Sequence, residues 1–159
     1  MKVMRLLSSL KHDESERGIF HLGRALVKNE HTSIIISSAD EDNDLVRRLK
    51  RDGNHYHQLY MNKKSWLSLL QVAPLRRLIE KYDPDIIHVH SRTPAWILHL
   101  ALRRARVKRR PKLVSTMYGF YPINKYSQAL LDVDTIITVS DSVTDYLKKG
   151  LRREELDPR

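Results

Sequence analysis

Four side chains that bind anions or exchange protons stand together at the end of one apolar run: His88, His90, Ser91 and Arg92. The residues before them, 85–89, are mostly β-branched and predict a strand buried on both faces. In open α/β sheets, ligands bind at the carboxyl ends of the strands. The pattern therefore predicts a ligand site at this strand tip, although His88 taken alone fits a hydrogen-bonded core residue equally well.

Other polar side chains fall at predicted strand ends or helix starts, and a parallel sheet brings these positions to the same edge. Helix N-termini at that edge offer backbone N–H groups and a partial positive charge, and Arg92 adds a group suited to bidentate anion contacts. Together these features indicate a site for a phosphate-bearing ligand. The additional residues are Asp13, Glu14, Ser15, Tyr118 and Ser140.

Several cofactor sites are excluded by what the sequence lacks. The first predicted turn, residues 7–13, has no glycine, so it does not match the dinucleotide-binding fingerprint, and the phosphate-binding loop ending in Gly-Lys-Ser/Thr is also missing. There is no cysteine for a disulfide, a thiolate ligand or a thiol nucleophile. Two histidine pairs, at 55/57 and 88/90, lack a nearby third ligand, so we expect no metal and no cofactor.

Strand-like and helix-like patterns alternate along the chain, as in βαβ units. We expect an α/β fold with a Rossmann-like, doubly wound and mostly parallel sheet. Pro74 is expected to open a second helix within 65–82, and Gly150 to end the last helix. The expected central strands are 2–8, 32–38, 85–89, 112–116 and 135–139, with a weaker edge strand at 55–59 and helices near 15–29, 44–51, 94–104 and 140–147.

The net charge of +10 is concentrated in clusters, the largest being residues 103–112, which contain no acid. Such a basic run, here called the basic connector, attracts polyanions such as anionic lipid. We expect Arg106, Lys108, Arg109 and Arg110 to form this anion-binding surface. Nucleic acid is an unlikely partner because the connector has no aromatic residue to stack on bases. No apolar run approaches the ~20 residues that span a bilayer, so any membrane contact would be peripheral.

Four segments together resemble the amino-terminal domain of family-four glycosyltransferases, in particular the branch that includes lipopolysaccharide and surface-glycan transferases. Their order and spacing match that domain over nearly the whole chain. The segments are Ser15-Glu16-Arg17-Gly18, Asp85-Ile86-Ile87-His88-Val89-His90-Ser91-Arg92, Tyr118-Gly119-Phe120-Tyr121 and Ile136-Ile137-Thr138-Val139-Ser140-Asp141-Ser142-Val143.

The resemblance implies one half of a GT-B architecture, in which two Rossmann-like domains face each other across a cleft. It implies retaining transfer from a nucleotide sugar with no obligatory metal. Residues 1–150 would form the acceptor-side domain, and residues 151–159 would begin the interdomain linker. The nucleotide sugar would bind only with a carboxyl-terminal donor domain. The residues expected to contact a glycan or glycolipid acceptor are His90, Ser91, Arg92, Tyr118 and Asn124.

The chain departs from the family pattern at two places. Asp13 and Glu14 replace a Gly-Gly turn, and their carboxylates would repel the donor diphosphate. Tyr118 stands where the family has a histidine near the reacting sugar. Because tyrosine cannot take over the roles of a neutral imidazole near pH 7, no catalytic residue is assigned.

We therefore expect the acceptor-side half of a retaining glycosyltransferase, inactive by itself. We expect a cytoplasmic protein, with peripheral contact to the inner face of a membrane through its basic surface. The alternative is a non-catalytic module that uses the same surface to bind anionic lipid or another polyanion.

Overall fold

A computed structural model describes residues 1–10, 14–61 and 66–156 of the chain. It contains one sheet in the order β3-β2-β1-β4-β5-β6, and every strand pairing is parallel. The doubly wound parallel sheet expected from the sequence is therefore confirmed. Its strands are β1 (Lys2–Leu6), β2 (Thr32–Ser37), β3 (His55–Gln58), β4 (Ile86–Val89), β5 (Lys112–Met117) and β6 (Thr135–Thr138).

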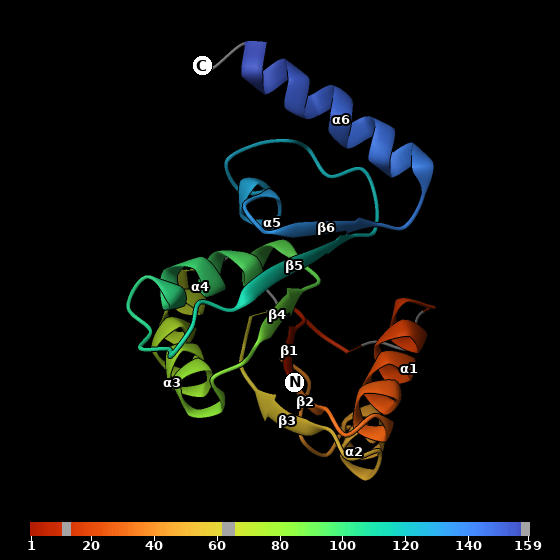
Figure 1. Ribbon diagram of the computed structural model, residues 1–159, viewed down its shortest axis with the longest axis vertical. Coiled ribbons are helices and arrows are strands. Elements are labelled where there is room, and N and C mark those ends of the chain that lie inside the picture. The colour runs from red at the N-terminus through yellow and green to blue at the C-terminus, as the bar shows by residue number, and fades with distance from the viewer. Residues whose placement is uncertain (11–13, 62–65, 157–159) are drawn as a thin grey trace.

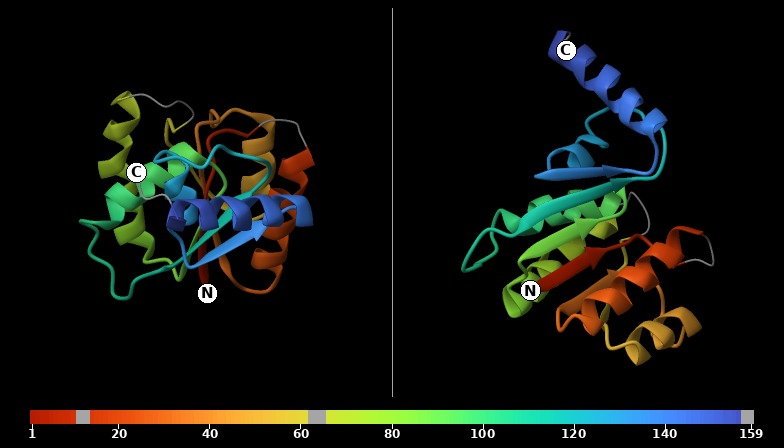
Figure 2. Two further views of the ribbon diagram at one scale, coloured as in Figure 1. Left: turned by 90° about the horizontal axis from the view of Figure 1, so that it is seen from above. Right: turned by 45° about the vertical axis from the view of Figure 1, so that its right-hand side comes forward.

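Helices cover both faces of the sheet (Figures 1 and 2). One face, here called the α1 face, carries α1 (Glu14–Lys28) and α2 (Asp44–Arg51). The opposite α4 face carries α3 (Val72–Tyr82), α4 (Arg92–Leu102) and the short α5 (Gln128–Leu131). A 3-10 helix, η1 (Trp66–Gln71), precedes α3, and α6 (Asp141–Leu156) lies beyond β6 at the far end of the molecule.

The larger hydrophobic core lies on the α4 face. Side chains from the central strands, including Met4, Ile34 and Ile87, pack there against Leu75 of α3 and Leu98 of α4. All five are almost completely buried. Such continuous burial explains why these strands are rich in β-branched and other apolar residues.

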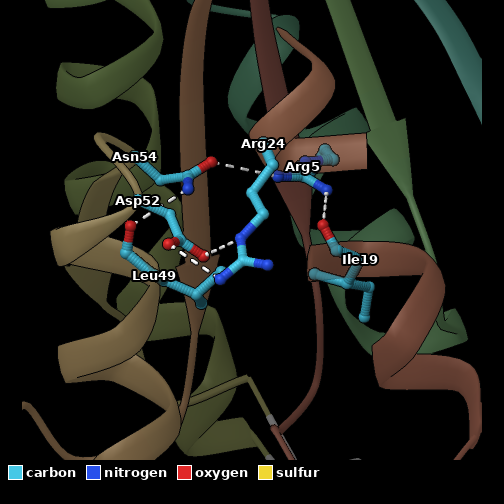
Figure 3. Close-up of polar contacts among 6 residues, drawn as sticks. All are labelled: Arg5, Ile19, Arg24, Leu49, Asp52 and Asn54. Carbon is cyan, nitrogen blue, oxygen red and sulfur yellow. Dashed lines mark hydrogen bonds and ion pairs between the residues drawn. The ribbon is translucent and has the colours of Figure 1, made fainter. Parts of the chain in front are cut away.

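The α1 face instead has a buried charge near its centre. Arg5, on the middle strand, is 0% exposed, and its guanidinium donates to the Ile19 carbonyl at 2.6 Å and the Ser33 hydroxyl at 3.0 Å. A longer bond of 3.4 Å reaches Asn54 Oδ1, whose own amide donates to the Leu49 carbonyl (Figure 3). The guanidinium thus joins β1 to α1, β2 and the segment after α2.

Gly23 allows α1 to approach this charge closely. A Cβ atom added at Gly23 would lie 2.6 Å from Asn54 Oδ1 and 2.8 Å from an Arg5 guanidinium nitrogen. Beside it, Arg24 makes two hydrogen bonds to Asp52 at the end of α2, which ties the two helices together (Figure 3). The glycine is therefore required by packing, despite its poor helix propensity.

Three local expectations can be compared with the structure. Pro74 lies in the first turn of α3, which follows η1 directly, so the prediction of a second helix is confirmed. The prediction that Gly150 ends the last helix is wrong, because α6 continues to Leu156. A Cβ at Gly150 would overlap Ile123, so this glycine lets the loop after β5 pack closely against α6.

The segment 135–139 was expected to be central, but β6 is an edge strand within the described part of the chain. Its exposure follows from that position, since Ile137 and the neighbouring Val139 are both about half exposed. An apolar, β-branched sequence predicts a strand without fixing its place in the sheet.

We predict that Gly23→Ala destabilises the protein by about 1–3 kcal/mol, because the methyl group must displace the Arg5–Asn54 contact. Gly18→Ala is the matched control, since Gly18 lies on the same helix with nothing within 4 Å of an added Cβ. That change should be neutral or stabilise by up to ~1 kcal/mol through helix propensity. Urea unfolding of both variants would measure this, and equal stabilities would contradict the packing explanation.

Candidate functional site

A groove of about 910 Å³ opens at the carboxyl edge of the sheet, where β1 and β4 lie side by side. The chain winds away from this point in both directions, through β2 and β3 on one side and β5 and β6 on the other. Ligands of open α/β sheets bind at such switch points. The groove, here called the switch-point groove, is lined by Ser8, Ser91, Arg92, Thr93, Tyr121, Asn124, Lys125 and Tyr126.

Backbone geometry at the tips of β1 and β4 places Ser91 in this groove. The His90 amide donates to the Leu6 carbonyl at 3.0 Å, which extends the pairing of the two strands by one residue. The Ser8 amide donates to the Ser91 hydroxyl at 3.2 Å, and Ser91 caps α4 without a side-chain bond to the helix. The first-turn amides of α4 thus have no side-chain acceptor from their cap, which suits them to an anionic ligand.

Arg92 lies between two aromatic rings. The carbon at the centre of its guanidinium is 5.1 Å from the ring centroid of Tyr121 and 5.0 Å from that of Tyr126. These distances suit cation–π contacts, which orient the guanidinium plane. An oriented guanidinium favours bidentate recognition of phosphate or carboxylate.

The loop after β5 is folded by its own polar groups. Asn124 Oδ1 accepts the backbone N–H groups of Tyr126 and Ser127, both at 3.0 Å. The hydroxyls of Thr93 and Tyr126 are hydrogen bonded, which connects the loop to the start of α4. Lys125 is exposed beside them and adds a second cation to the groove.

The five residues expected to contact an acceptor divide into two groups. Ser91, Arg92 and Asn124 line the switch-point groove. His90 and Tyr118 lie outside its lining and form their own pair, with His90 Nδ1 2.8 Å from the Tyr118 hydroxyl. Their contact with an acceptor stays a prediction.

His88 is a hydrogen-bonded core residue. It is 8% exposed, its Nε2 is 2.8 Å from the Thr116 hydroxyl, and its ring centroid is 4.1 Å from that of His90. The core interpretation that the sequence left open is the one observed. Its side chain lies on the α1 face, because it is in register with Arg5 on the neighbouring parallel strand.

Burial and the nearby Arg5 charge keep both histidines neutral. Burial first, and then the guanidinium, lowers the pKa of His88 to about 4. Burial, followed by His88 and Arg5, holds the pKa of His90 well below its ordinary value. Burial also lowers the pKa of Arg5 to about 10, which leaves this side chain charged at neutral pH. Arg5 is a determinant of this region that the sequence analysis missed.

The first-turn residues are only partly described. Asp13 lies outside the described residues. Glu14, which was expected in the turn, is the first residue of α1, and Ser15 follows it in that helix as expected. The repulsion of a diphosphate by these carboxylates therefore stays a prediction.

The basic connector lies between α4 and β5, at the amino edge of the sheet and thus opposite the switch-point groove. Although the run itself contains no acid, its charge is partly compensated by ion pairs. Arg109 lies 3.8 Å from Asp85, while Arg110 and Lys112 lie 3.3 and 3.6 Å from Asp134. Acids distant in sequence supply these partners, which a local count of charges could not reveal. Exposed pairs of this kind contribute only ~0–1 kcal/mol each.

Residues 1–10, 14–61 and 66–156 contain neither a cluster of metal ligands nor a membrane-spanning helix. No three potential metal-ligating side chains come together in those ranges. None of the helices found there is both long and apolar enough to cross a bilayer.

Five of the residues that line the switch-point groove were not predicted from the sequence. A local signal exists for some of them, since tyrosines and a lysine follow the strand at 112–117 closely, but only the fold brings that loop against α4. These residues are Ser8, Thr93, Tyr121, Lys125 and Tyr126.

Comparison with known proteins shows what this fold resembles. The family described as Glycosyltransferase Family 4 matches residues 15–157. The putative glycosyltransferase EpsD of Bacillus subtilis is 31% identical over 94 residues, which cover 50% of this chain and 23% of EpsD.

Solved structures share the fold of this chain. A glycosyltransferase from Rickettsia africae superposes with a TM-score of 0.71 at 27% identity, covering 92% of this chain and 38% of that one. The lipopolysaccharide outer core galactosyltransferase WaaB also gives a TM-score of 0.71, at 14% identity, with coverages of 94% and 42%. The chain therefore spans less than half the length of these similar proteins.

The neutral histidines predict a pH dependence of stability. Because the pKa of His88 is lower in the folded protein than in the unfolded chain, unfolding takes up protons below pH ~6.5. Stability should therefore fall between pH 7 and 4, and His88→Gln should remove roughly 2–4 kcal/mol of that loss.

Urea unfolding at a series of pH values would measure this effect. His21→Gln, which changes an exposed histidine on α1, should retain the pH dependence of the unmodified protein. If the free energy of unfolding of His88→Gln changed with pH as steeply as that of the unmodified protein, the neutral, buried state of His88 would be contradicted.

Proposed function

Because this chain belongs to glycosyltransferase family 4, we propose that it forms the acceptor-side domain of a retaining glycosyltransferase. The enzyme would move a sugar from a nucleotide sugar to a glycolipid or polysaccharide acceptor. The observation that carries the proposal is the switch-point groove, in which Arg92 is oriented by two tyrosines beside the start of α4. That arrangement suits a glycan bearing a phosphate or another anion.

The nucleotide sugar is proposed to bind elsewhere, on a carboxyl-terminal domain. The similar proteins are more than twice as long as the parts that this chain matches. Residues 1–150 would receive the acceptor, residues 151–159 would begin the connection between domains, and the 159-residue chain alone would be inactive. We place the enzyme in the cytoplasm, where nucleotide sugars are its proposed donors.

His90 and Tyr118 are proposed to border the acceptor from the side of β5. The Tyr118 hydroxyl is within hydrogen-bond distance of neutral His90, so the imidazole orients it without carrying a charge. We assign neither residue as a base, and we give neither a catalytic role.

Transfer of a radiolabelled sugar tests this function. The 159-residue chain should show no transfer, whereas a form that includes the donor-binding half should transfer with retention of anomeric configuration. In that form, Arg92→Gln should raise the KM for the acceptor at least tenfold because the oriented cation is lost.

Arg47→Gln is the matched control, since Arg47 is an exposed cation on α2. It should leave the acceptor KM unchanged. An inverted product, transfer by the isolated chain, or normal kinetics in Arg92→Gln would each refute the corresponding part of the proposal.

We separately propose that the basic connector contacts an anionic membrane peripherally. The same contact would be the function of the chain under the alternative, a non-catalytic module that binds anionic lipid. Its support is the exposure of the basic connector, including Arg106 and Lys108, neither of which forms a side-chain ion pair with another described residue. Because the connector lies at the amino edge, a membrane there would face away from the switch-point groove.

Cosedimentation with lipid vesicles tests the membrane contact. Each basic residue near an anionic bilayer contributes roughly 1 kcal/mol, so the chain should bind anionic vesicles at low salt and dissociate as salt increases. Replacing Arg106, Lys108, Arg109 and Arg110 with Gln should abolish this preference while leaving the fold intact. If the unmodified chain does not cosediment with anionic vesicles at low salt, the membrane proposal is wrong.

A further inference from the structure

An apolar groove of about 450 Å³ adjoins the switch-point groove. Its apolar walls are formed by Trp66 and Leu69 on η1 and by Trp96 and Ile97 on α4, and the loop after β5 borders it as well. Trp66 is 74% exposed, Leu69 49% and Trp96 43%, so large apolar surfaces here face solvent. We call this feature the tryptophan groove.

The two grooves are continuous. Thr93, Lys125 and Tyr126 line both of them, so a single ligand can extend from one into the other without leaving the surface. The shared boundary carries Lys125, and Arg92 lies just inside the switch-point groove. The combined site is therefore polar at one end, cationic at the junction and apolar at the other end.

We propose that the acceptor is a lipid-linked glycan whose anionic linkage, a phosphate or diphosphate, lies at this junction. Its sugar would occupy the switch-point groove, and its aliphatic chain would lie in the tryptophan groove. The inference rests on the proposed function and narrows its acceptor from glycans in general to phosphate-linked glycolipids. It names a binding site for the lipid portion of the acceptor.

The size and chemistry of the tryptophan groove fit an aliphatic chain. A volume of 450 Å³ holds roughly fifteen groups at the ~30 Å³ that a water molecule occupies in the liquid. A chain of about ten carbon atoms would fit, and tryptophan rings provide large contact areas for it. A polysaccharide without a lipid would leave this apolar surface exposed.

A membrane surface is the competing occupant, and the charges distinguish the two. The basic connector lies at the opposite edge of the sheet, so it would not assist a bilayer at the tryptophan groove. The cations near this groove are at its junction with the polar site, as an anionic linkage within one ligand requires.

Tryptophan fluorescence provides a direct readout. The chain contains 2 tryptophans, and both line the tryptophan groove, so any shift of emission reports on that groove. The probe is decyl phosphate below its critical micelle concentration, compared with butyl phosphate and with uncharged decyl maltoside. Each fully buried methylene should tighten binding roughly fourfold, so decyl phosphate should shift the emission to shorter wavelength at concentrations at least twentyfold lower than butyl phosphate.

Two variants separate the apolar and ionic contributions. Leu69→Asp should weaken decyl phosphate binding at least tenfold. Leu22→Asp is its matched control, because Leu22 is a similarly exposed leucine on α1, and it should have no effect. Lys125→Gln should weaken decyl phosphate binding at least threefold and leave decyl maltoside binding unchanged. Far-ultraviolet circular dichroism would check that each variant is folded.

Three results would overturn the inference. Equal affinities for butyl and decyl phosphate would show that the protein does not bind the alkyl chain of the probe. Emission shifts only above the critical micelle concentration, or with vesicles alone, would identify a membrane-contact patch instead. An unchanged affinity of Leu69→Asp for decyl phosphate would show that the alkyl chain binds outside the tryptophan groove. None of these results would affect sugar transfer to a water-soluble acceptor, so the proposed function would be judged separately.

Discussion

A positive charge buried in the middle strand constrains the whole α1 face of the sheet. Two guanidinium nitrogens of Arg5 donate to the Ile19 carbonyl and to polar side chains of neighbouring segments, while its buried Nε has no hydrogen-bond partner among the described residues. A buried charge is tolerated only with such partners. This requirement fixes the distance of α1 from the sheet, and Gly23 is the residue that makes that distance possible. Burial, with this charge as a lesser cause, lowers the pKa of His88 and of His90 and keeps both neutral.

The pairing of β1 with β4 connects this constraint to the site. Arg5 is in register with His88, and the pairing extends beyond the strands to the bond between the His90 amide and Leu6. The tip of β4 is therefore held firmly where Ser91 turns into α4. Arg92, the first residue of that helix, then meets the tyrosines of the loop after β5. The residues buried on the α1 face thus support the switch-point groove, although none of them lines it.

The sequence predicted the fold well because alternating strand and helix patterns are local and strong. It also identified Ser91 and Arg92, since strand tips can be located from the same patterns, whereas Asn124 was expected from the family resemblance. What it could not predict depends on contacts between distant segments. The loop at 118–126 joins the groove through contacts with Arg92 and Thr93 at the start of α4, and the edge position of β6 depends on strand order. Likewise, an arginine inside an apolar strand predicts no particular partners.

The central claim, that the switch-point groove receives the acceptor, is tested most directly by nuclear magnetic resonance. Amide chemical shifts of the ¹⁵N-labelled chain would be followed during titration with glucose 6-phosphate, a small anionic sugar. The account predicts that the largest changes occur at Ser8, at residues 91–93 and at residues 121–126. Changes confined to the basic connector, or no saturable change up to ~20 mM, the weak end of the range for such ligands, would contradict it.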